Sequence, residues 1–250
     1  MPAEVKRYHF GVDDLLERID WHYFHWAWGV TKAGDEEQGR LRRDANQLLA
    51  QWRHLQPVKA LLMTIPANSD GDDLILGDRL DMRMPMLRQQ NMKAPDGHSL
   101  CVADFVRPVS HGVRDTIGMF CTTVDDCLTT GYDNDPYLRM MAQTLADRLA
   151  EAAAERVNDD MPGIRPAVGY PMMPDMSLNF IIDSILDMRS VGITLTETGM
   201  MMPHASVSGI IIQHPAAHYF NIGSVGNDQL EDYARRRGMT VAEMRRFIKS

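Results

Sequence analysis

Residues 165–170, Arg-Pro-Ala-Val-Gly-Tyr, combine several residue types that suit a ligand-binding segment. Arg165 carries a planar, permanently charged guanidinium that can hold a carboxylate through two parallel hydrogen bonds. Pro166 fixes its own φ and biases Arg165 towards an extended backbone, and Gly169 lets the backbone approach a ligand closely. Tyr170 adds an aromatic face and one hydroxyl. Residue types alone leave two interpretations open, a binding segment or a stiff turn with a structural arginine.

Two acidic residues, Asp20 and Glu151, lie in sequence settings where their carboxylates could have a functional role. Asp20 precedes an aromatic stretch, residues 21–28, and a carboxylate buried among aromatic rings must find a partner, because unpaired burial is strongly unfavourable. Glu151 falls in an alanine-rich segment of helical character, where the alternative is a solvated side chain. His22 and His25 are spaced three apart, but no third ligand follows at a recognisable spacing, so we expect no metal site.

The composition limits the class of protein. The chain has 250 residues, enough for one domain or a compact two-lobed one. Its 34 acidic and 26 basic residues give a formal net charge of -8, which argues against nucleic acid or an anionic membrane as the main partner. No apolar run is long enough to cross a bilayer, and no signal peptide is visible. The three cysteines lack CxxC spacing, which is typical of reduced thiols in a cytoplasmic protein.

The hydrophobic pattern predicts helices and strands in separate blocks. Helices are expected at residues 12–28, 35–54, 134–157, 175–189, 228–237 and from a capping box at Thr240 onwards, with Asp175 as a candidate cap. Strands are expected at residues 58–63, 73–76, 116–122, 193–196, 207–213 and 219–225. Strands bunched together with helices at their flanks favour an α+β fold over a Rossmann alternation.

The order of several short segments along the chain is more specific evidence of a protein family than any single segment. They include residues 19–21, 66–68, 71–73, 87–90, 103–106, 145–151, 165–170, 195–197, 203–209, 214–215, 219–220 and 228–236. Together they resemble the S-adenosylmethionine-binding activation domain of cobalamin-dependent methionine synthase, over about residues 12 to 248. This resemblance implies one C-shaped domain over residues 1–250, with a central antiparallel β-sheet flanked by helices. Its N-terminal part, to about residue 57, would be helical, and residues 58–250 would hold the sheet and the other helices.

The resemblance also assigns residues to the chemical groups of S-adenosylmethionine. Arg165 would hold the carboxylate, and Asp20 and Glu151 would face the ammonium or the ribose hydroxyls. The pocket wall would come from Ala167, Gly169, Tyr170, Tyr219 and Phe220. Small residues would let the chain pass close to a cobalamin, namely Ala205, Ser206 and Ser208.

The function implied is the reductive methylation of cob(II)alamin on a separate corrinoid protein, which reactivates methionine synthase in trans. An electron would come from a flavodoxin-like donor. The cobalamin would be carried by the partner, because Asp20-Trp21-His22 begins an Asp-x-His-x-x-Gly pattern but His25 replaces its glycine. Methyl transfer from a sulfonium moves no proton, so we expect binding residues and no catalytic acid or base. The alternative is a non-catalytic docking module for a different corrinoid methyl carrier.

Overall fold

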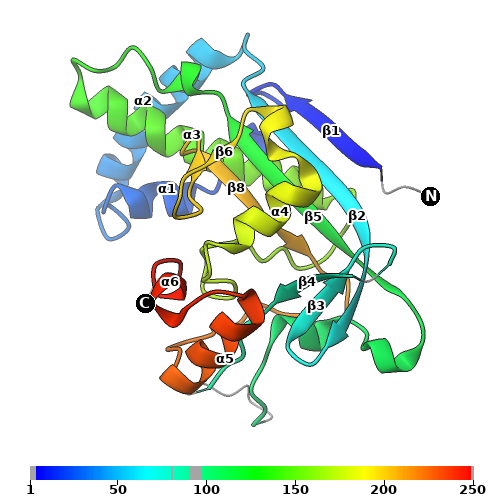
Figure 1. The fold of residues 1–250 in the computed structure, drawn as a ribbon. Helices are drawn as coiled ribbons and strands as arrows, with labels where there is room; N and C mark the ends of the chain where they lie inside the picture. The colour runs from blue at the N-terminus through cyan, green and yellow to red at the C-terminus, as the bar shows by residue number, and fades with distance from the viewer. Residues whose placement is uncertain (1–3, 80, 91–96, 249–250) are drawn as a thin grey trace.

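The computed structural model describes residues 4–79, 81–90 and 97–248, and its centre is a curled, six-stranded antiparallel sheet (Figure 1). The strands are β1 (Val5–Phe10), β2 (Val58–Asp70), β3 (Asp73–Leu76), β4 (Met82–Pro85), β5 (Asp115–Val124) and β8 (Ser206–Ile211). Their order is β4-β3-β2-β5-β8, and β1 pairs with the first half of β2. A separate two-stranded sheet holds β6 (Thr194–Leu195) and β7 (Met201–Met202).

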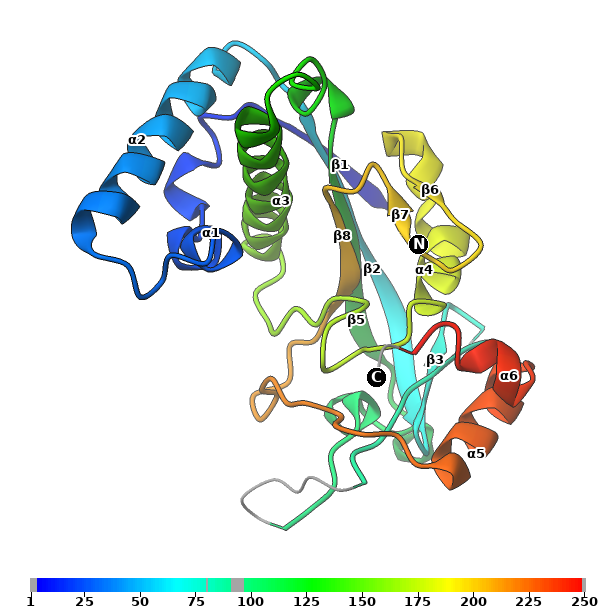
Figure 2. The same cartoon turned by 90° about the vertical axis from the view of Figure 1, so that its left-hand side faces the viewer.

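Helices cover both faces of the sheet (Figure 2). The long helix α3 (Pro136–Asn158) packs on one face, and α4 (Leu178–Leu186) packs on the other. Outside α3 lie α1 (Trp21–Ala27) and α2 (Asp35–Trp52). The C-terminal helices α5 (Asn227–Arg237) and α6 (Val241–Met244) contact each other, and α5 packs against β4. The structure thus confirms the predicted α+β class.

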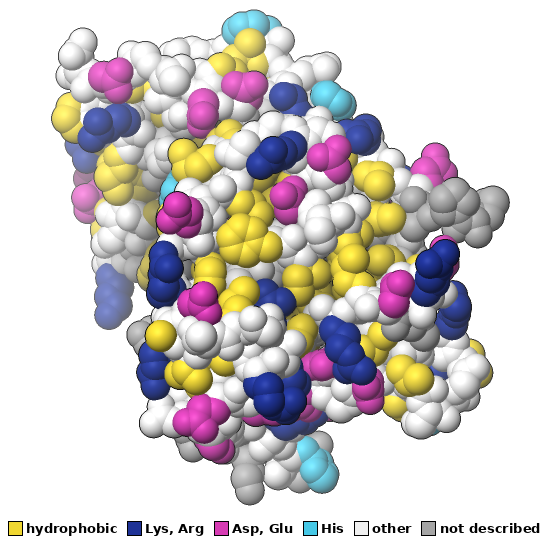
Figure 3. Space-filling view, viewed as in Figure 1, with side chains coloured by type: hydrophobic (Ala, Val, Ile, Leu, Met, Phe, Trp, Pro, Cys, Tyr) yellow, Lys and Arg dark blue, Asp and Glu magenta, His cyan; other side chains and the backbone are white. Residues whose placement is uncertain are grey.

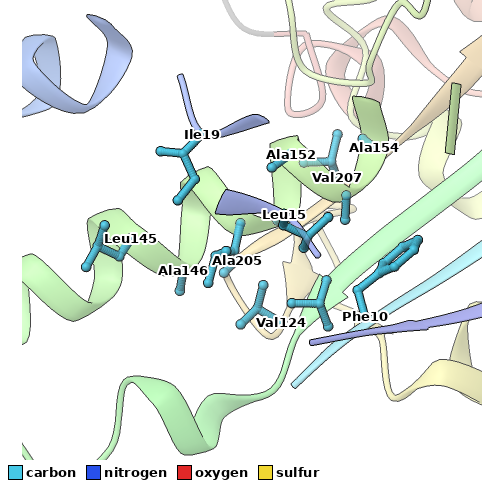
Figure 4. Close-up of a cluster of buried hydrophobic side chains, with 14 of the residues drawn as sticks. Phe10, Leu15, Ile19, Val124, Leu145, Ala146, Ala152, Ala154, Ala205 and Val207 are labelled. Carbon is cyan, nitrogen blue, oxygen red and sulfur yellow. The ribbon is translucent and has the colours of Figure 1, made fainter. Parts of the chain in front are cut away.

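The alanine-rich sequence of α3 allows that helix to lie close against the sheet. Its buried alanines pack with aliphatic side chains from β8 and from the segment before α1 (Figure 4). Pro136 stands in the first turn, where a missing N–H costs nothing, and Asp135 caps the helix by accepting from two backbone amides at 3.0 Å. The position of α3 matters for function because Glu151 lies on it.

Strand alternation decides which face each β8 side chain serves. Val207 belongs to the core under α3, and Ile210 belongs to the core under α4. Ser208 points to the α4 side, where its buried hydroxyl bonds to Oδ1 of Asn179. Neighbouring side chains of β8 therefore point to opposite faces of the sheet.

Most of the predicted elements are confirmed. Helices α2, α3 and α5 match their predicted ranges, Gly238 ends α5 with a φ of 66°, and the capping box at Thr240 is present. The predicted strands at 58–63, 73–76 and 116–122 are also present, and the first of them continues as β2 to Asp70. The N-terminal part predicted to be helical also contributes strand β1 to the sheet.

Three predictions about elements are wrong. The helix over residues 12–28 is divided into a 3-10 turn (Leu16–Arg18) and α1, because Asp20 is extended and caps α1. Asp175 does not cap α4, whose N-cap is Ser177, because its carboxylate is engaged in a buried network. Residues 219–225 form no strand: they are irregular, and the amide of Ile222 donates to the Pro171 carbonyl at 2.9 Å.

Candidate functional site

A cavity of about 630 Å³ opens between α1, α3 and two irregular segments. Its volume lies within the range typical of small-molecule sites. It collects all the residues predicted to contact the ligand except Gly169. The lining consists of Arg18, Asp20, Tyr23, Arg148, Glu151, Glu155, Arg165, Pro166, Ala167, Tyr170, Pro171, Met172, Tyr219, Phe220 and Asn221.

The sheet holds the wall that carries Arg165. Isolated bridges join Ile164 to Ile212 and Ala167 to Gly209, so this segment runs along the free edge of β8. The amide of Ile210 donates to the Pro166 carbonyl at 3.1 Å. A Cβ on Gly209 would stand 2.2 Å from that same carbonyl oxygen, so only glycine permits this close approach. The backbone of Arg165 is therefore positioned by the sheet.

Arg165, Glu151 and Tyr170 form a connected cluster in the cavity wall. Nη1 of Arg165 lies 3.6 Å from Oε2 of Glu151, and the Tyr170 hydroxyl donates to Oε1 of the same carboxylate. The side chains of Arg165 and Glu151 are 16% and 22% exposed, so both are accessible from the cavity. Burial, followed by the charge of Glu151, raises the pKa of Tyr170, which keeps this hydroxyl protonated as a donor.

The wall continues from the Arg165 segment to the irregular segment at Tyr219 and Phe220. The Tyr219 hydroxyl accepts a hydrogen bond from the backbone amide of Arg165 at 2.8 Å, while its ring is 62% exposed. The Phe220 ring packs 6.1 Å from the Phe105 ring and anchors the segment in the core. A free aromatic face thus stands beside the Arg165 segment.

Asp20 reaches the cavity from the N-terminus of α1, but its setting differs from the prediction. It is exposed, and its Oδ1 accepts from the Tyr23 amide at 3.0 Å. The neighbouring aromatic rings do not bury it: Tyr23 and Trp26 are themselves 54% and 67% exposed. Helix capping therefore already gives this carboxylate a structural partner.

Sequence reasoning missed several charged residues of the lining. Arg18 pairs with Asp159 at 2.6 Å, and Glu155 lies 3.9 Å from the same guanidinium. Arg148 stands three residues before Glu151 on α3, a spacing that places both side chains on one helix face and could have identified it. With these residues the lining carries as many arginines as carboxylates, a balance that suits a ligand bearing both charges: Arg18, Arg148, Arg165, Asp20, Glu151 and Glu155.

Gly169 lies behind the cavity wall. Its φ is 86°, its amide donates to the Met173 carbonyl at 2.8 Å, and a Cβ here would stand 2.7 Å from Sδ of Met176. It lines a second cavity of about 680 Å³, which shares Tyr170 with the first. Gly169 therefore shapes the turn that presents Tyr170.

The three small residues predicted to face a cobalamin are mostly covered. Ala205 is 4% exposed and lies in the core beside α3 (Figure 4), and Ser208 is 0% exposed on the α4 side. Ser206 is half-buried, with its hydroxyl 2.8 Å from Oγ1 of Thr123. In this arrangement the side chains of Ala205 and Ser208 do not reach the surface, because the sheet and its helices cover them.

Other kinds of site have little support in the described part of the chain. Among those residues, no three His, Cys, Asp or Glu side chains gather in a way that could hold a metal ion. Burial raises the pKa of Cys101 and Cys121 to about 12, so both thiols stay protonated. No described helix is both long and apolar enough to cross a membrane. On the face drawn in Figure 3, basic and acidic side chains are interspersed.

Two comparisons with known proteins agree with each other. The sequence model of the family described as "Vitamin B12 dependent methionine synthase, activation domain" matches residues 11–162 and 158–238. A crystal structure of the MetH reactivation domain bound to AdoHcy is similar to this chain at 31% sequence identity, with a TM-score of 0.86. That match covers 98% of this chain and 89% of the other.

Proposed function

The chain belongs to the activation-domain family of vitamin B12-dependent methionine synthase, and on that premise we propose that it binds S-adenosylmethionine in the cavity beside Arg165. We further propose that it supports reductive methylation of a cobalamin on a separate corrinoid protein. The observation that carries the proposal is the convergence of Asp20, Glu151, Arg165 and Tyr219 on one cavity from four separate segments. The similar MetH domain is bound to AdoHcy, the product that S-adenosylmethionine leaves after it loses its methyl group.

The charges of the cavity fit the amino-acid end of this ligand. Arg165 and Glu151 are 3.6 Å apart, so a ligand with a carboxylate and an ammonium can supply each with an opposite charge. Tyr170 keeps Glu151 in place through its protonated hydroxyl. The exposed ring of Tyr219 offers a stacking face for the adenine.

The bound cobalamin would supply a strongly nucleophilic cobalt that accepts the methyl group. The residues of this chain position the sulfonium and limit water access, which is where the protein contributes to such reactions. No described residue needs to move a proton, since displacement at a sulfonium methyl releases none. The electron would come from a flavodoxin-like protein. The three cysteines are free thiols, which suits a reducing compartment such as the cytoplasm.

The first test is calorimetric titration of the protein with S-adenosylmethionine. Arg165→Ala should raise the dissociation constant at least about thirtyfold, because truncating one partner of a desolvated charge pair costs about 2–5 kcal/mol. Arg139→Ala is the matched control, since Arg139 is exposed on α3 and does not line the cavity. An unchanged constant in Arg165→Ala would refute the assignment of Arg165.

A second measurement separates methyl transfer from simple docking. The protein, a cobalamin-bearing methionine synthase fragment and a chemical reductant are mixed with S-adenosylmethionine that carries a labelled methyl group. Label on the cobalamin supports the reactivation function. Tight ligand binding without transfer would instead favour the docking module for another corrinoid carrier.

A further inference from the structure

Three arginines line the cavity, and Arg148 differs from the other two in its partners. Arg18 is neutralised by Asp159 at 2.6 Å, and Arg165 faces Glu151 at 3.6 Å. Among the described residues, none offers Arg148 a carboxylate within ion-pair distance; its guanidinium carbon lies 5.6 Å from the centre of the Tyr23 ring. Arg148 is therefore the cavity arginine that has no ion pair with a described carboxylate, although the charge of Arg148 does act on the neighbouring Asp147.

The arrangement on α3 explains why Arg148 is left without a carboxylate. Glu151 lies on the same helix face at the i, i+3 spacing that usually allows an ion pair. Its two oxygens are already engaged, one by the Tyr170 hydroxyl and the other by Arg165. On the other side of Arg148 in sequence, Asp147 accepts from Gln143 at 3.1 Å and lies 3.5 Å from Nδ1 of His204.

Arg148 also lies close to the centre of the site. The positive charges of Arg148 and Arg165 both act to lower the pKa of the Tyr170 hydroxyl, against the larger raising effect of burial. Both guanidinium groups therefore lie within electrostatic range of the hydroxyl that holds Glu151. Arg148 is half-buried, and its flat guanidinium can rest on the Tyr23 ring while its donors face the cavity.

We propose that Arg148 is a second anchor for the carboxylate of the bound ligand and selects ligands that keep the complete amino-acid group. The inference rests on the proposed function, because it concerns the same cavity. A carboxylate that reaches Arg148 breaks no ion pair with a described residue, whereas at Arg165 it competes with Glu151. Arg148 thus favours ligands that carry the carboxylate over those that end in an amine or lack the side chain.

The test compares two ligands that differ only in the carboxylate, S-adenosylmethionine and its decarboxylated form. Calorimetric titrations are carried out on the wild type, Arg148→Met and Arg165→Ala. Methionine keeps an apolar stem against Tyr23 but removes the charge. We expect Arg148→Met to weaken S-adenosylmethionine about tenfold, the scale of one charge-assisted hydrogen bond, and to leave the decarboxylated ligand within about twofold.

The possible outcomes separate this inference from the proposed function. An equal loss for both ligands in Arg148→Met, or no loss for either, overturns the role of Arg148. If Arg165→Ala still loses affinity in that case, the proposed function stands without Arg148. A wild type that binds neither ligand refutes the proposed function and this inference together. Arg139→Met on the same helix, with a thermal melt of each variant, controls for general effects on α3.

Discussion

The molecule contains two clusters of the same composition, each made of an arginine, a carboxylate and a tyrosine. In the cavity these are Arg165, Glu151 and Tyr170, and in the second cluster they are Arg237, Asp175 and Tyr233. The cavity carboxylate is 22% exposed and Tyr170 is 48% exposed, whereas Asp175 and Tyr233 are 1% and 0% exposed. The same three residue types therefore form one cluster that a ligand can reach and one cluster that is buried.

The sealed cluster is also more completely bonded. Asp175 accepts from the Tyr233 hydroxyl at 2.7 Å and from the amide and hydroxyl of Ser177, each at 2.8 Å. Arg237 donates to the Ser177 hydroxyl at 2.6 Å, which ties α5 to the segment before α4. The cavity cluster has one loose ion pair and one hydrogen bond. Burial and the larger number of hydrogen bonds indicate a structural role for the cluster of Arg237, Asp175 and Tyr233. Accessibility and the smaller number of internal bonds indicate a binding role for the cluster in the cavity.

The largest expected difference between the clusters is in stability. Asp175→Ala should lower the free energy of unfolding by about 3–5 kcal/mol, because it leaves Arg237 charged and unpaired in the interior. Glu151→Ala should change it by no more than about 1 kcal/mol, since water in the cavity can solvate Arg165. Urea unfolding followed by tryptophan fluorescence measures both. Equal losses of unfolding free energy in the two variants would show that the clusters contribute equally to stability.

In ligand affinity the cavity cluster should matter more than the buried cluster, and the change in free energy should be smaller than the change in stability. Glu151→Ala should weaken S-adenosylmethionine binding about tenfold, since the ammonium then loses a charged acceptor. Glu231→Ala, at an exposed position on α5 outside the cavity lining, is the matched control and should bind as the wild type does. If the two variants bound equally well, Glu151 would have no part in the site.

The smallest expected effect is the loss of stability in alkaline solution. Burial raises the pKa of both Tyr233 and Tyr170 above the ordinary 10.0, and the adjacent carboxylates act in the same direction. The folded state then holds these protons more tightly than the unfolded state, so stability is complete below pH 10 and declines above it. The decline is at most about 1.4 kcal/mol per pH unit for one group.

Phenylalanine variants assign that decline to one cluster or the other. Tyr233→Phe and Tyr170→Phe should each remove a similar part of the slope between pH 9 and 11, because the pKa of each tyrosine is raised well above 10.0 and both stay protonated in the folded state over this range. The slope of unfolding free energy against pH is the relevant measurement, since the lost hydrogen bond shifts the whole curve. A variant that leaves the slope unchanged would show that its tyrosine is not held protonated by the folded state.

Much of the cavity wall could be predicted from sequence because several short segments, in their order along the chain, resemble a known family. The residue types of the Arg-Pro-Ala-Val-Gly-Tyr segment and the helical setting of Glu151, taken alone, left structural roles open. The distinction between the two clusters was out of reach, because Asp175 and Tyr233 are 58 positions apart and their burial depends on how α5 packs. The same limit applies to Arg148, whose lack of a carboxylate partner follows from bonds made by Glu151 to other segments.

The wrong predictions share a physical cause. Residues 219–225 have the apolar character of a strand, but the amide of Ile222 bonds to Pro171 and not to a neighbouring strand. Asp175 was expected to cap a helix, but α4 begins after Ser177, and the carboxylate of Asp175 bonds to the Tyr233 hydroxyl. In both cases the residue types were compatible with the prediction, and the tertiary partner decided the outcome.

The contact between Gly209 and Pro166 has a consequence for the thermodynamics of recognition. Since the Arg165 segment is held against β8 by backbone hydrogen bonds, its conformational entropy is lost when the protein folds and not when a ligand arrives. Binding free energy is then available for discrimination between ligands. A side chain at position 209 would push this segment off the sheet, so a residue that lines no part of the cavity governs how rigid its wall is.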